Sequence, residues 1–155
     1  MLTISLADYL WYVDEALDAM VGIVTDLGDE LANRRPQLAG ANSPYVILTH
    51  CLGVMEFWGG QAVAGRAIER DRAAEFVASG PVADLADRAT AARARLRADV
   101  AALESLAVPR GTVYGPDALT PVGTTQGGVL LHIYEELCQH LGQMELTRDV
   151  LLAAQ

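Results

Sequence analysis

The stretch from Ser43 to Trp58, SPYVILTHCLGVMEFW, decides the fold of this chain. Ser43 followed by Pro44 is typical of a helix start, because serine caps the first turn and proline fits the first helical position. The residues that follow are apolar on almost every side of a helix, which is typical of an element covered by several neighbours. We therefore predict a buried helix that runs from Ser43 to about Gly65.

The segment before this helix carries the pattern of another long helix. Its apolar residues recur at alternating spacings of four and three, which places them on one helical face: Leu6, Leu10, Val13, Leu17, Met20, Val24, Leu27 and Leu31. We expect this first helix to end near Asn33, because Pro36 and Gly40 favour a turn in the segment that follows.

Two further helices are predicted after the buried one. Residues 67–81 form a charged connection, and a weaker apolar stripe among arginines then indicates a surface helix: Leu85, Ala89, Ala92, Leu96, Val100 and Leu103. In residues 107–123, prolines and glycines disfavour a regular element. Thr124 or Thr125 can cap a last helix that runs to near Leu152.

Four helices without strand-like alternation predict an all-α fold, a four-helix bundle that forms a single domain over residues 1–155. The formal net charge of −9 argues against a nucleic-acid partner, because phosphate recognition needs clustered basic side chains, which are spread out here. No apolar run is long enough to span a membrane, and the N-terminus lacks the features of a signal peptide.

Three further features of the composition indicate the source organism, the cellular compartment and the oligomeric state. All 11 basic residues are arginines, a bias typical of GC-rich bacterial genomes. Cys51 and Cys138 both lie in helical patterns, so we expect two buried free thiols in a cytoplasmic protein rather than a disulfide. The apolar excess of so small a chain favours a homodimer that buries helix surface.

Three histidines and one carboxylate are few enough to be tested as one metal site. His132, Glu136 and His140 follow one another at intervals of four in the last helix, and His50 lies in the buried helix. Since a helix rises about 1.5 Å per residue, His132 and His140 lie about 12 Å apart along the axis and cannot both reach one ion through bonds of about 2 Å. Only one of them can share an ion with Glu136.

The apolar face of the last helix favours His140. Around the helix axis, His140 lies about 60° from the centre of that face and His132 about 140°, so we expect His132 to point mostly outward. His50 reaches His140 only if its helix is antiparallel to the last one. A simple up-down-up-down bundle favours His132 instead, but the connection at 67–81 can span about 50 Å and reverse the direction.

Two imidazoles and one carboxylate leave one coordination position open, which is typical of a catalytic zinc site where a bound water or thiol becomes more acidic. The residues also allow a bundle without metal. In that alternative His132 and Glu136 lie on the helix surface, and His50 and His140 are hydrogen-bonded histidines of the core.

Two segments resemble a known family: residues 43–58 and residues 131–142, LHIYEELCQHLG. They resemble the DinB-like superfamily, in particular the mycothiol-dependent maleylpyruvate isomerase N-terminal type, and the similarity extends over nearly the whole chain, including RDRAAEF at residues 70–76. The resemblance implies long crossover connections between helices two and three and between helices three and four, with helix two antiparallel to helix four.

The resemblance also implies a site and a chemistry. An early histidine of the second helix and a Glu-x-x-x-His pair of the last helix bind a divalent metal, which carries over to His50, Glu136 and His140. The metal is usually zinc, with nickel or another first-row metal as alternatives. It activates mycothiol, or bacillithiol in other bacteria, toward a small electrophile, since a metal-bound thiolate is a better nucleophile than a free thiol.

The chain departs from the family pattern in two respects. Many relatives carry a second histidine where this chain has Gln143, and maleylpyruvate isomerases have a C-terminal domain that this sequence lacks, so we expect a thiol S-transferase of actinobacterial type rather than an isomerase. Gln143 is interpreted as a solvated side chain or as one that orients a ligand. The rival hypothesis is a non-catalytic helical homodimer with a structural or vestigial metal, acting in stress response or binding a partner.

Overall fold

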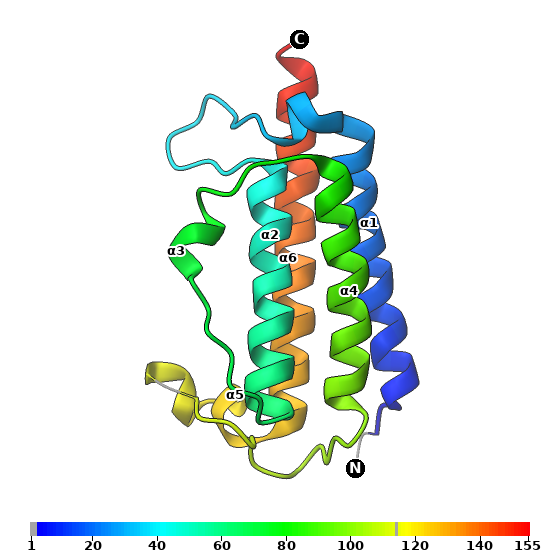
Figure 1. The fold of residues 1–155 in the computed structure, drawn as a ribbon, viewed down its shortest axis with the longest axis vertical. Helices are drawn as coiled ribbons and strands as arrows, with labels where there is room; N and C mark the ends of the chain where they lie inside the picture. Colours follow the sequence, from blue (N-terminus) through cyan, green and yellow to red (C-terminus); the bar gives the residue numbers. More distant parts are fainter. Residues whose placement is uncertain (1–2, 114) are drawn as a thin grey trace.

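The computed structural model describes residues 3–113 and 115–155, and none of these residues lies in a strand, which confirms the all-α prediction. Four long helical segments lie side by side (Figure 1): α1 (Leu6–Ala32), α2 (Pro44–Met55) continued by the π-helix η1 (Glu56–Val63), α4 (Val82–Val100) and α6 (Gln126–Ala153). None of the helices in these two ranges combines the length and hydrophobicity that a membrane span requires.

Side-chain caps start the helices where the sequence indicates. The Ser43 hydroxyl accepts a hydrogen bond from the backbone N–H of Val46 at 3.2 Å. At the start of α6, the Thr125 hydroxyl accepts from the N–H of Gly128 at 3.0 Å. Each cap satisfies a backbone donor that has no partner within its helix. Of the two threonines that the sequence offers, Thr125 is therefore the cap.

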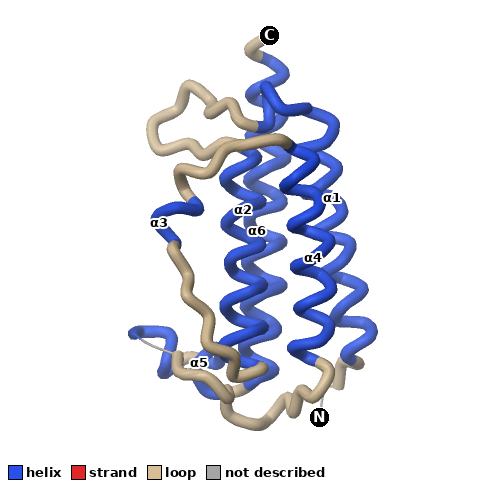
Figure 2. The backbone as a smooth tube through the Cα atoms, in the orientation of Figure 1, coloured by secondary structure: helices blue, strands red, loops and turns tan. Residues whose placement is uncertain are grey.

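The chain direction brings α2 antiparallel to α6. In Figure 1, α1 and α6 run upward, whereas α2 and α4 run downward. The connection at residues 64–81 returns along the length of α2 and contains the short helix α3 (Arg72–Glu75), as the tube in Figure 2 also shows. This segment, the crossover, gives α2 and α6 the opposite directions that the metal hypothesis requires.

The second long connection differs from the expected crossover. Its described parts, residues 101–113 and 115–125, stay at the end of the molecule where α4 ends and α6 begins (Figure 1). They contain the short helices η2 (Gly115–Leu119) and α5 (Pro121–Thr124), so the prediction that this region lacks regular elements is only partly right. A crossover is not needed here, because α4 and α6 already run in opposite directions.

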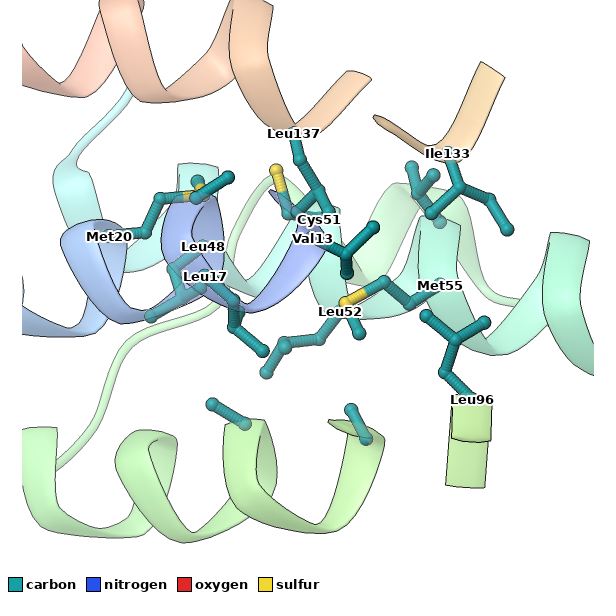
Figure 3. Packing of buried hydrophobic residues seen from close by; sticks show 14 of the residues in the cluster. Val13, Leu17, Met20, Leu48, Cys51, Leu52, Met55, Leu96, Ile133 and Leu137 are labelled. Carbon is teal, nitrogen blue, oxygen red and sulfur yellow. The ribbon is translucent and has the colours of Figure 1, made fainter. Parts of the chain in front are cut away.

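A hydrophobic core between the long helices holds them in register. Figure 3 shows side chains from α1, α2, α4 and α6 meeting in one cluster. The labelled residues are all buried: Val13, Leu17, Met20, Leu48, Cys51, Leu52, Met55, Leu96, Ile133 and Leu137. Burial of each large apolar side chain stabilises the folded state by about 1.5–3 kcal/mol, so α2 and α6 are fixed firmly against each other.

The second half of the buried helix is a π-helix. The predicted helix does extend close to Gly65, but its last eight residues form η1 rather than α-helix. Gly59 and Gly60 lie in η1 against α4 and the crossover. A Cβ at Gly59 would lie 2.6 Å from Leu96 Cδ1, and one at Gly60 would collide with the Arg66 guanidinium. At both positions a larger residue would require the end of the neighbouring side chain to shift, so the two glycines allow the close approach seen here.

Candidate metal centre

His50, Glu136 and His140 lie together between α2 and α6. One ligand atom of each residue lies within 4.8 Å of the other two. Glu136 Oε2 is 3.5 Å from His50 Nε2 and 3.3 Å from His140 Nε2. The three residues that the sequence singles out are therefore neighbours in space, because the antiparallel helices bring the first half of α2 level with the middle of α6.

A buried ion pair lies behind His50, which the sequence interpretation missed. Glu75 is the last residue of α3, and its Oε2 lies 2.8 Å from His50 Nδ1. Arg70 donates to both carboxylate oxygens of Glu75, at 2.6 Å from Nε and 2.9 Å from Nη2. The side chains of His50 and Glu75 are only 6% and 9% exposed. The crossover thus supplies a buried carboxylate to the candidate centre.

The contact between His50 Nδ1 and Glu75 Oε2 sets the tautomer of His50. A carboxylate only accepts hydrogen bonds, so His50 Nδ1 carries the hydrogen and Nε2 keeps its lone pair in the neutral ring. Arg70 Nη2 also lies 3.3 Å from His50 Nδ1. Arg70 Nη2 and a protonated His50 Nδ1 are both donors, so they do not hydrogen-bond each other. The shorter contact of Nδ1 with Glu75 therefore determines which ring nitrogen carries the hydrogen. The free lone pair of Nε2 faces Glu136.

Gln143 orients the ring of His140 as Glu75 orients that of His50. Its Oε1 lies 2.8 Å from His140 Nδ1. An amide oxygen only accepts, so Nδ1 donates, and in the neutral ring the lone pair of His140 Nε2 also faces Glu136. Of the two interpretations of Gln143, this contact favours the one in which it orients a ligand, although the side chain is exposed.

The converging atoms suit a first-row metal. Imidazole nitrogen and carboxylate oxygen are common ligands of zinc, and two histidines with one carboxylate leave a fourth tetrahedral position free of protein. Each histidine also donates its other ring hydrogen to an oxygen acceptor, as metal-bound histidines usually do. The donor set therefore fits a divalent cation at this place.

The charges of the site are coupled. In the metal-free protein a proton on histidine Nε2 takes the place of a cation, and Nε2–H then donates to Glu136. The hydrogen bond with His140, and after it the one with His50, lowers the pKa of the Glu136 carboxyl well below its usual range, although partial burial opposes the shift. The hydrogen bond with Glu136 raises the pKa of His140, again against the effect of burial. Glu136 is consequently ionised at neutral pH, and a cation must compete with a proton for His140.

His132 does not point mostly outward, so that prediction is wrong. Its side chain is 18% exposed, against 26% for His140. The ring packs edge to face on Trp58 of η1, with centroids 5.0 Å apart. Its Nε2 lies 3.8 Å from Glu136 Oε1, on the other carboxylate oxygen from the one that faces His50 and His140. The π-helix covers this side of α6, which the apolar pattern of α6 alone does not reveal.

The two cysteines are free, as predicted, but only Cys51 is buried. Cys138 is exposed, which corrects the expectation of two buried thiols. Burial raises the pKa of the Cys51 thiol far above its ordinary value, and the nearby charges of Glu136 and Glu75 add to the effect. Cys51 is therefore protonated and inert, and it does not act as a nucleophile.

Two cavities lie near the centre. One of 560 Å³ is lined by His132, Leu131, Asp117 and Thr120 among others, and so adjoins Glu136 through His132. The other, of 200 Å³, lies between α2 and α4 and is lined in part by Gly53, Glu75 and Arg88. Glu75 thus lines the second cavity and also contacts His50. The first cavity is lined by none of the three converging residues and is linked to them through His132.

The helices and the converging ligands define a class of protein, an all-α protein with a candidate centre of two histidines and one glutamate. The family model for mycothiol-S-transferase matches residues 8–152. The chain belongs to this family, which is part of the DinB-like superfamily. The match confirms the resemblance to the DinB-like superfamily found in the sequence. No curated protein matches the chain.

Proposed function

We propose that this protein is a metal-dependent mycothiol S-transferase with the DinB-like four-helix-bundle architecture. In this proposal His50, Glu136 and His140 hold a divalent cation, zinc in the first place, with nickel or another first-row metal as alternatives. The observation that carries the proposal is the convergence of their ligand atoms within 4.8 Å. The family of the chain supports mycothiol as the thiol and transfer as the reaction.

The residues of the chain prepare the site for a thiol. Glu75 and Gln143 hold the imidazoles of His50 and His140 with both Nε2 atoms toward Glu136. When bound, the metal supplies positive charge that favours the thiolate form of a thiol at neutral pH. The thiol gives up its proton to the solvent, and its sulfur forms a bond to an electrophilic carbon. The electron pair of the bond that breaks goes to the displaced group, which leaves an arene as an anion or, in an epoxide, remains attached as an oxygen that takes up a proton.

We propose that the cavity of 560 Å³ receives a part of the substrates other than the reacting atoms. Asp117 and Thr120 offer hydrogen-bonding groups there, and Leu131 offers apolar surface. His132 lines this cavity and lies 3.8 Å from Glu136, so it links the cavity to the centre. This arrangement supports a binding function of the cavity in the same reaction.

Compartment and assembly belong to the same proposal. Two free cysteines and a reduced thiol as cosubstrate are typical of the cytoplasm. Trp11 and Tyr12 on the surface of α1 are 55% and 54% exposed, and their rings contact each other with centroids 4.9 Å apart. Aromatic surface of this kind supports a homodimer.

The test combines metal content with thiol transfer. Protein purified without chelator should contain about one zinc per chain by elemental analysis and should consume mycothiol in the presence of an electrophilic arene or epoxide. His140→Ala should lose metal and activity together, while Glu145→Ala, an exposed control on the same helix, keeps both. Full zinc occupancy in His140→Ala would contradict the site. Metal without thiol consumption would favour the non-catalytic homodimer.

A further inference from the structure

Glu75 is buried, and burial of a charged carboxylate costs free energy of folding. It lies at the end of a four-residue helix in a crossover that otherwise has no helix, and Asp71 caps that helix by accepting from the N–H of Ala74 at 3.0 Å. A carboxylate with 9% exposure is tolerated only when it is paired and hydrogen-bonded. Arg70 supplies the charge and His50 supplies the donor.

The Glu75 carboxylate packs directly against α2, and α2 has room for it only because position 53 is glycine. A Cβ at Gly53 would collide with Glu75 Oε1 and would lie 3.3 Å from Arg70 Nε. Glycine inside a helix is unfavourable compared with alanine. The close approach of Glu75 to α2 therefore explains a glycine that the helix itself disfavours.

We infer that Glu75 is a positioning residue of the metal centre, which orients His50 by accepting its Nδ1 hydrogen and thereby ties the crossover to the centre. This inference rests on the metal site of the proposed function. A carboxylate behind a metal-bound histidine fixes the ring and makes it a stronger ligand. Because coupling is reciprocal, a docked crossover that improves metal binding must itself be stabilised by the metal.

Zinc affinity of the full-length protein tests the positioning role. Chelator competition should give an affinity about 10–100-fold weaker for Glu75→Leu, which removes the acceptor of the Nδ1 hydrogen, than for the unchanged protein. Gly53→Ala should weaken affinity in the same direction, because its methyl group displaces the carboxylate while every polar group is kept. Two controls should bind as the unchanged protein does: Glu69→Gln, an exposed glutamate of the crossover, and Gly22→Ala, a helical glycine with open space around it.

Cleavage by trypsin tests the link to the crossover. Zinc should slow cleavage after Arg70 and Arg72 in the unchanged protein, and the protection should shrink in Glu75→Leu. Circular dichroism establishes that each variant is folded, and Gly53→Ala decides the matter by the same criteria where Glu75→Leu does not fold. Unchanged zinc affinity and protection in the folded variant overturn the inference. Absence of zinc binding by the unchanged protein overturns the proposed metal site instead.

Discussion

The imidazole rings of His50 and His140 meet edge to face, with centroids 4.9 Å apart and an angle of 86° between their planes. They come from α2 and α6, which run in opposite directions (Figure 1). Glu136 Oε2 lies close to Nε2 of both rings. Each ring is fixed from behind, by Glu75 and by Gln143, so its geometry is set before any ligand enters.

Glu136→Gln should remove the stabilisation of the fold by zinc. A cation that binds only the folded protein stabilises it by about 4 kcal/mol at a thousand times its dissociation constant. We expect most of this gain to disappear in Glu136→Gln, which keeps the shape of the side chain but not its charge. Glu135→Gln, the exposed neighbour, should retain it. Urea unfolding with and without zinc measures the difference, and an equal gain in both variants would mean that zinc binds elsewhere.

The sequence contains most of the information that defines the fold. Hydrophobic spacing locates the long helices, and the caps Ser43 and Thr125 fix two of their starts, because both signals are local. Chain direction is a longer-range property. The length of the crossover allows α2 to be antiparallel to α6, but only the family resemblance selects this arrangement before the structure does.

The candidate site is predictable in part. His50, Glu136 and His140 could be selected because spacing and helical angle limit which residues share an ion. Glu75 could not, since its contact with His50 depends on how the crossover lies against α2, and no periodic pattern reports this. Residues 70–76, which resemble the family, include Glu75, so this resemblance was the one indication in the sequence that Glu75 could belong to the site.

His132→Ala should keep its metal. The side chain lies outside the group of converging ligands and packs on Trp58. Loss of the aromatic contact should destabilise the protein by about 1 kcal/mol, while zinc stoichiometry by elemental analysis stays unchanged. Gln139→Ala, on the exposed side of α6, serves as control and should change neither quantity. Loss of zinc from His132→Ala would make His132 a ligand and refute the selection of His140.

The two thiols should differ sharply in reactivity. At pH 8 an alkylating reagent should modify Cys138, which is exposed, and leave Cys51 untouched, because burial raises the pKa of Cys51 and keeps it protonated. Mass spectrometry of the native protein should show a single modification, which Cys138→Ser abolishes and Cys51→Ser does not. In denaturant both cysteines should react. Rapid modification of Cys51 in the native protein would indicate that α2 opens locally.

The pair of Glu136 and His140 should make the metal-free protein depend on pH. The raised pKa of His140 means that the folded protein binds its proton more tightly than the unfolded chain. Stability from this residue is therefore complete below its ordinary pKa of 6.5 and is lost as pH rises through the raised value. For Glu136, whose pKa is lowered, stability is present above the ordinary value of 4.5 and is lost as pH falls through the lowered one.

The pair therefore stabilises the metal-free protein most between about pH 4.5 and 6.5. The difference in unfolding free energy between the unchanged protein and His140→Gln should be largest in this window and should shrink toward pH 8. Zinc affinity should show the opposite trend and increase with pH, because the cation displaces the proton of His140. Urea titrations of both proteins, with and without zinc, measure both trends. A difference that grows toward pH 8 without metal would contradict the ion pair between Glu136 and His140.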